Sequence, residues 1–175
     1  MSLYRYGKFS PKIGEKCFVA PDASIIGRVH SGINSSIWFS VVARGDVNQI
    51  SIGENTNIQD LSILHVTYER PLLIGDGVTI GHSVTLHACT IENYCLIGMG
   101  ATILDGATIG KNSVVAGGSV CPPGKIYPPY SMIMGNPAKV TRELREEEIV
   151  EYGNHYKSYI KMKNDYLDSS IFEPL

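Results

Sequence analysis

The chain has 175 residues and a formal net charge of -2, with 43% hydrophobic and 18% charged residues. This length suits one domain with a substantial core, and the composition argues against a disordered chain and against a nucleic-acid-binding protein. No apolar run has the length of a signal peptide or of a membrane span. We therefore expect a soluble cytoplasmic protein that binds neither nucleic acid nor membranes.

Aliphatic residues recur every six positions along most of the chain. In chain order, the leading residues of these hexads are Ile13, Val19 and Ile25, a less regular stretch through Ile33, Phe39 and about Val47, then Ile52, Ile58, Leu64, Ile74, Ile80, Leu86, and every sixth residue from Ile91 to Cys121. A period of six suits neither antiparallel hairpins nor an amphipathic helix, but it is typical of a β-solenoid. The pattern resembles the left-handed parallel β-helix, an all-β fold in which three hexads make one triangular coil, so the 18 hexads predict about six coils.

The hexad spacing changes at two places, and both lie beside histidines. Between Leu64 and Ile74 the spacing is ten, which predicts a loop over Val66–Leu72 that bulges from the coil. Between Leu86 and Ile91 the spacing is five.

The repeat is followed by a segment of different character. Prolines cluster after Cys121, and because proline cannot continue a strand ladder, they predict an irregular exit from the solenoid. From Glu146 to Lys163, apolar residues recur at helical spacing behind three successive glutamates. We expect residues 1–140 to form the β-helix domain with its exit loop, and residues 141–175 to form a helical tail that packs on it.

The four cysteines do not include a CxxC pair. We expect them to be small buried side chains rather than disulfide partners or metal ligands.

Three of the five histidines fall within 23 residues. We expect the other two, His30 and His155, to be ordinary polar residues. His65 and His87 are each the second residue of a hexad, and those hexads lie three steps apart, which is one full coil. Their imidazoles should therefore stack on one outward face at a spacing that suits two ligands of one metal ion.

His82 occupies the third position of its hexad and therefore lies on an adjacent face. It cannot easily reach a metal held by His65 and His87 of its own chain. In a closed homotrimer, however, it would face the histidine pair of a neighbouring copy. Three neutral imidazoles with an open fourth position are a pattern of catalytic zinc, although Fe²⁺ or Co²⁺ would also suit these ligands.

Several motifs resemble the γ-class carbonic anhydrases and their short carbonic-anhydrase-like relatives, over about residues 10–150. The matching segments are Ala43–Asp46, Asn57–Asp60, His65, Ile80–His87, Gly98–Ala101 and Met134–Ala138. The resemblance implies reversible hydration of CO2 to bicarbonate by a metal-bound hydroxide at the trimer interfaces.

The resemblance also implies individual roles. His65 and His87 of one subunit and His82 of the next would bind the metal, in agreement with the hexad register. Gln59 would orient the reacting water, and Arg44 and Asp46 would form an ion pair that bridges subunits near the site. Asp60 would be the accompanying acid beside His82. Because the loop after His65 carries a single acid, Glu69, we expect weak turnover.

Two other functions fit the same repeat. One is acyl transfer from an acyl-CoA with one histidine as general base, which explains the fold and the trimer but leaves two of the clustered histidines without a role. The other is a metal-stabilised trimeric scaffold of little catalytic power, which the scarcity of acids in the loop favours.

Overall fold

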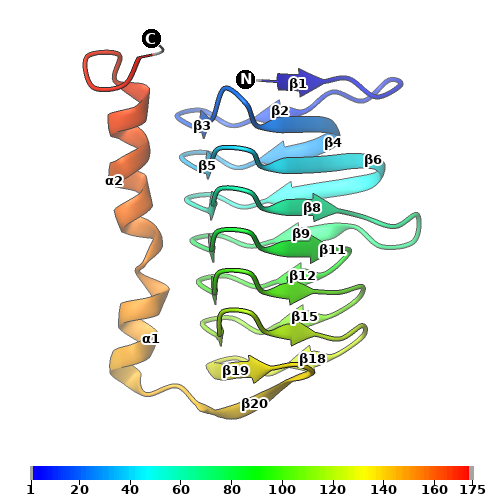
Figure 1. Ribbon diagram of the computed structural model, residues 1–175, viewed down its shortest axis with the longest axis vertical. Helices are drawn as coiled ribbons and strands as arrows, with labels where there is room; N and C mark the ends of the chain where they lie inside the picture. Colours follow the sequence, from blue (N-terminus) through cyan, green and yellow to red (C-terminus); the bar gives the residue numbers. More distant parts are fainter. Residues whose placement is uncertain (1, 174–175) are drawn as a thin grey trace.

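The computed structural model describes residues 2–173, which wind into a parallel β-solenoid with a helical tail along one side (Figure 1). Each turn contributes short strands to three faces. Face 1 contains β1 (Ser2–Tyr4), the first part of β4 (Ser24–Ser31), the first part of β6 (Val42–Ile52), β8 (Ile63–His65), β11 (Thr85–His87), β14 (Thr102–Ile103) and β17 (Val120–Cys121). Face 2 contains β2 (Lys12–Ile13), the last parts of β4 and β6, β9 (Leu72–Ile74), β12 (Thr90–Ile91), β15 (Thr108–Ile109) and β18 (Ile126–Tyr127).

Face 3 is a separate sheet of parallel strands. It contains β3 (Phe18–Val19), β5 (Ser36–Ile37), β7 (Asn57–Ile58), β10 (Thr79–Ile80), β13 (Leu96–Ile97), β16 (Val114–Val115) and β19 (Ser131–Gly135), and it ends with β20 (Ala138–Glu143), which runs antiparallel to β19. The other two faces form one sheet, because β4 and β6 continue around the corner between them.

The solenoid has about seven turns, one more than the hexad count predicts. The predicted irregular exit after Cys121 is wrong, because β18 and β19 continue the parallel ladders. The prolines on either side of β18 lie in the turns at residues 122–125 and 128–130. A turn needs no ladder hydrogen bond from its nitrogen, so proline is tolerated there.

The core is a set of ladders in which like residues stack on like. Ile58, Ile80 and Ile97 are register partners on face 3 and are fully buried. Each such side chain stabilises the fold by roughly 1.5–3 kcal/mol through loss of contact with water. These ladders fix the register of each turn, and therefore determine which neighbouring residues point outward.

The structure corrects the register expected between residues 31 and 47. The expected leading residues were Ile33, Phe39 and Val47. The buried positions in ladder register are Ser31, Ile37 and Ala43. Ile33 is half exposed instead. The six-residue period is intact here, but a serine and an alanine occupy two of its inward positions and hide it from an aliphatic pattern.

The predicted loop after His65 is confirmed. It joins β8 to β9 and projects beyond the edge of the solenoid (Figure 1). A bulge within β6 supports it, because Asn48 donates a hydrogen bond to the carbonyl oxygen of Tyr68 at 3.1 Å.

All four cysteines are free, and three of them are buried. Burial raises the pKa of Cys89 and raises that of Cys95 to about 12, so both are protonated at neutral pH. The expectation of buried, unpaired side chains is thus confirmed except at Cys17, which is partly exposed.

The C-terminal helix predicted from Glu146 is confirmed, with a break at Asn154 and His155 that separates α1 (Glu146–Gly153) from α2 (Tyr156–Leu167). It runs along the solenoid (Figure 1). Its aromatic side chains pack on the first turns, where the ring centroids of Tyr166 and Trp38 lie 4.9 Å apart. Neither helical segment in residues 2–173 is long and apolar enough to cross a membrane.

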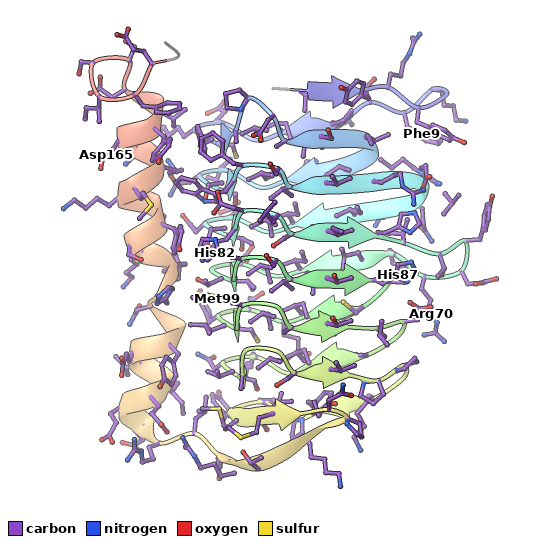
Figure 2. The ribbon with its side chains drawn as sticks, viewed as in Figure 1. Phe9, Arg70, His82, His87, Met99 and Asp165 are labelled. Carbon is purple, nitrogen blue, oxygen red and sulfur yellow. The ribbon has the colours of Figure 1, made fainter. Side chains whose placement is uncertain are left out.

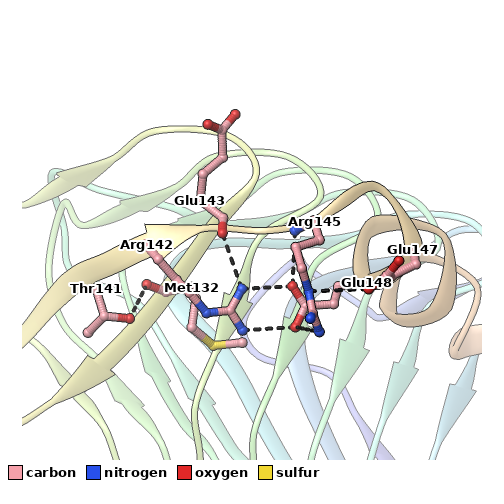
Figure 3. Close-up of polar contacts among 7 residues, drawn as sticks. All are labelled: Met132, Thr141, Arg142, Glu143, Arg145, Glu147 and Glu148. Atoms are coloured by element: carbon pink, nitrogen blue, oxygen red, sulfur yellow. Dashed lines mark hydrogen bonds and ion pairs between the residues drawn. The ribbon is translucent and has the colours of Figure 1, made fainter.

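A cluster of charges fixes the start of the tail (Figure 3). The buried Glu148 carboxylate accepts hydrogen bonds from the Arg142 guanidinium at 2.7 and 2.8 Å, from the Arg145 guanidinium at 3.2 Å and from the Arg145 backbone nitrogen at 2.9 Å. The bonds from Arg142 hold the pKa of Glu148 far below its usual range. This carboxylate therefore joins β20 to α1.

We predict that Glu148→Gln lowers the unfolding temperature at pH 7. Folding lowers the pKa of Glu148. Its ionised carboxylate therefore stabilises the fold fully at pH values above about 4.3, the ordinary pKa of a glutamate side chain. The deficit of the variant should therefore shrink as the pH falls from 5 to 3. Thermal melts followed by circular dichroism measure it. Glu147→Gln makes the same charge change at an exposed pair and should have little effect; equal melting shifts in both variants would contradict the assignment.

Candidate metal centre

Two histidines from successive turns face each other on face 1. His65 ends β8 and His87 ends β11, and the two residues are register partners. Because Leu64 and Leu86 beside them point into the core, both imidazoles point outward. The distance from His65 Nδ1 to His87 Nε2 is 3.1 Å. The stacked pair expected from the hexad register is therefore present in the fold.

His82 lies elsewhere on the same chain. It follows β10 on face 3, and Figure 2 shows it on the opposite side of the solenoid from His87. Its side chain is 42% exposed. Within residues 2–173 of one chain, no group of three or more histidine, cysteine or acidic side chains is placed to hold a metal ion. The fold thus brings His65 and His87 together and keeps His82 apart from them.

Each of the three histidines contacts an aspartate through one ring nitrogen. His65 Nε2 lies 3.2 Å from Asp46 Oδ1, and His82 Nδ1 lies 2.8 Å from Asp60 Oδ2. His87 Nδ1 contacts the Asp105 carboxylate. Such carboxylates set the orientation and tautomer of an imidazole and leave its other nitrogen available as a ligand. The nitrogens that do not contact an aspartate are Nδ1 of His65 and Nε2 of the other two, and those of His65 and His87 lie within hydrogen-bond distance of each other.

The partial burial of His65 favours its neutral form. Partial burial lowers the pKa of His65. Burial by itself would raise the pKa of Asp46, but hydrogen bonds from Arg44 and His65 outweigh it and lower that pKa. Asp46 is therefore an anion at neutral pH beside a neutral imidazole, the state in which histidine binds metals. The ion pair between Arg44 and Asp46 forms within one chain.

Gln59 is buried in the turn after β7, where its Nε2 donates a hydrogen bond to Asn57 Oδ1 at 3.1 Å. No hydrogen bond joins it to a histidine anywhere in residues 2–173 of its own chain. The backbone nitrogen of Gln59 donates to the carbonyl oxygen of Ile80. Gln59 therefore lies in the turn that precedes the segment carrying His82.

Asp105 is a site residue that the sequence analysis missed. It stands two positions after Ile103, the register partner of Leu86, and so lies in the next turn along the chain, one residue beyond the register partner of His87. The hexad register could have revealed it, since Asp60 precedes His82 by one turn in a similar way. Arg70, from the projecting loop, lies against Gly106, the residue after Asp105.

Comparisons with known proteins fit these features. A family model described as bacterial transferase hexapeptide (six repeats) matches residues 88–123. A carbonic anhydrase of Geobacillus kaustophilus is 43% identical, with 95% of this chain and 97% of that protein covered. An uncharacterized transferase of Bacillus subtilis, YtoA, is 58% identical, with 89% of this chain and 96% of that protein covered.

Plant proteins and a solved structure are similar as well. The mitochondrial gamma carbonic anhydrase 2 of Arabidopsis thaliana is 46% identical over 87% of this chain, and the chain spans 57% of that protein's length. The chain spans 53% of gamma carbonic anhydrase 1 of the same plant. The crystal structure of a hexapeptide transferase family protein from Anaplasma phagocytophilum has a TM-score of 0.91 and 41% identity, with 94% of this chain and 98% of that chain covered. The chain therefore belongs to the gamma carbonic anhydrase-like hexapeptide-repeat family.

Proposed function

We propose that this protein is a γ-type carbonic anhydrase that hydrates CO2 reversibly to bicarbonate. The observation that carries the proposal is the set of three histidines, each oriented by its own aspartate, in a chain whose relatives are named carbonic anhydrases. A structural role alone would not require an aspartate at each of these outward-facing imidazoles.

The donor set fits a divalent metal. His65 Nδ1 and His87 Nε2 face each other, and burial favours the neutral form of His65. Imidazole nitrogens suit zinc, and also Fe²⁺ or Co²⁺. When bound, such a metal would supply a Lewis acid able to activate water at neutral pH.

The third ligand in this proposal comes from a second copy. His82 is half exposed and cannot join the pair on its own chain, so we place it against face 1 of a neighbour in a cyclic homotrimer. Exposed apolar residues support such contacts. Val42 and Ile63 are register partners on the strands that carry the His65 face, and Met99 lies one turn from His82 (Figure 2). We propose the left-handed coil of hexapeptide-repeat proteins for the solenoid.

The remaining residues of the proposed site bind bicarbonate or orient the reacting water and the histidines. The Arg44 side chain is 46% exposed beside the histidine pair, and its guanidinium can hold the bicarbonate anion. Asp46 keeps that guanidinium and His65 in place. Because Gln59 Nε2 is committed to Asn57, we assign its amide oxygen as the acceptor for a proton of the reacting water. Asp60 orients His82 for the neighbouring copy.

A second candidate is acyl transfer from an acyl-CoA. It is favoured by the family model and by relatives named transferases. This function would use one histidine as general base and would be indifferent to metal removal. Binding of a CoA thioester separates it from the anhydrase.

Stopped-flow measurement of CO2 hydration tests the proposed function. We expect the zinc-loaded protein to accelerate hydration, and chelation to abolish the acceleration. Equal rates with and without metal would reject the anhydrase, and saturable binding of acetyl-CoA by the same sample would then support the transferase.

We predict that Asp105→Asn weakens metal binding about 10- to 100-fold, because the imidazole of His87 loses the carboxylate that orients it. Competition with a chelator of known affinity measures the change, and the absorption spectrum of the Co²⁺ form reports the ligand geometry. Asp168→Asn is the matched control, since within residues 2–173 the Asp168 carboxylate accepts hydrogen bonds only from Ser170 in the tail. Unchanged affinity in Asp105→Asn would refute the assigned role.

A further inference from the structure

A second polar site lies near the N-terminal end of the solenoid, on face 2. It is a cleft of about 420 Å³ whose polar lining consists of Ser10, Lys12, Arg28, His30, Gln49 and Ser51. No aspartate or glutamate is among its described lining residues. Face 2 carries none of the three histidines assigned to the metal centre, so the cleft is a separate site.

Three of the side chains that line the cleft are stacked in register on neighbouring strands. Lys12, His30 and Ser51 are register partners on β2, β4 and β6. Their neighbours Ser31 and Ile52 are buried, so the three side chains point outward, one strand spacing of about 4.8 Å apart. Arg28 precedes His30 by two residues and lies on the same face of β4.

Arg28 is held in place but is not satisfied. Its guanidinium carbon lies 4.6 Å from the centre of the Phe9 ring, and its Nη2 donates to the carbonyl oxygen of Asp46 at 3.3 Å. Its Nε is buried and has no hydrogen-bond partner within residues 2–173. That burial closes Nε to a ligand as well, so an anion can meet only the rest of the guanidinium. Arg28 lines the cleft and no described aspartate or glutamate lines it beside Arg28, so its positive charge is available to an anion there.

We propose that this cleft binds a phosphate group, carried by a small phosphate ester or free. An arginine, a lysine and a histidine, with no acid among the described lining residues, favour a dianion over a singly charged carboxylate. A guanidinium carries several N–H donors in one plane, which suits the oxygens of a phosphate. The cleft is larger than phosphate alone requires, and this room favours an ester.

Isothermal titration calorimetry at low ionic strength tests the proposal, with inorganic phosphate and glycerol 3-phosphate as probes. We expect one saturable site per chain in the protein as purified and after chelation of metals. Arg28→Lys removes the guanidinium and keeps the charge, and Lys12→Gln removes an exposed charge without disturbing the core; each should weaken binding about tenfold or more. Lys125→Gln makes the same charge change at an exposed position outside the cleft and should bind normally.

The outcomes separate the cleft from other sources of binding. Tighter binding of glycerol 3-phosphate than of inorganic phosphate supports the ester. Absence of binding by either probe, equal affinity for acetate, or equal weakening in Lys125→Gln would overturn the proposal. Loss of binding on chelation would also overturn it, since the anion would then occupy the metal centre. Because binding is measured on chelated protein too, failure of the anhydrase activity leaves the proposal standing.

Discussion

In-register stacking of parallel turns is the constraint on which this molecule depends. Inward Ile, Leu and Val side chains stack on their equivalents in the adjacent turns and are buried there. The strands therefore cannot change their pairing register without exposing these side chains. A shift of one residue would turn an entire ladder outward. Positions adjacent to the ladders are therefore placed as firmly as the core itself. Functional side chains on the outer surface inherit that order, which is why His65 and His87 meet without any special loop to bring them together.

The same constraint explains which features could be read from the sequence. The hexads predicted the solenoid, the histidine pair and the projecting loop, because aliphatic residues mark the inward positions on both sides of that pair. The register failed between residues 31 and 47, where Ser31 and Ala43 fill inward positions without an aliphatic side chain. The seventh turn is hidden in the sequence because the prolines around β18 resemble strand breakers, whereas they occupy the turns.

The site residues also divide into those that the hexad register places and those that depend on side-chain conformation. Asp60 was expected beside His82 and lies there, while Asp105 was overlooked although the register places it beside His87. Contacts that depend on side-chain conformation were beyond sequence reasoning. The amide of Gln59 turns toward Asn57, and Arg28 stacks on Phe9 with an unpaired nitrogen, because rotamers and burial decide both. Neither arrangement leaves a mark on the hexad pattern.

The central claim is that each metal site is built from two copies, with His65 and His87 from one and His82 from the next. Co-expression of differently tagged His82→Ala and His65→Ala chains tests it through the metal content of the purified trimers. Each variant alone should bind no metal, whereas every mixed trimer restores one interface with all three histidines. In a random 1:1 mixture, each interface has the required order of chains with a probability of about one quarter. All trimers together should therefore hold about one quarter of the wild-type metal. Metal bound by either variant alone, or no recovery in verified mixed trimers, would contradict the account.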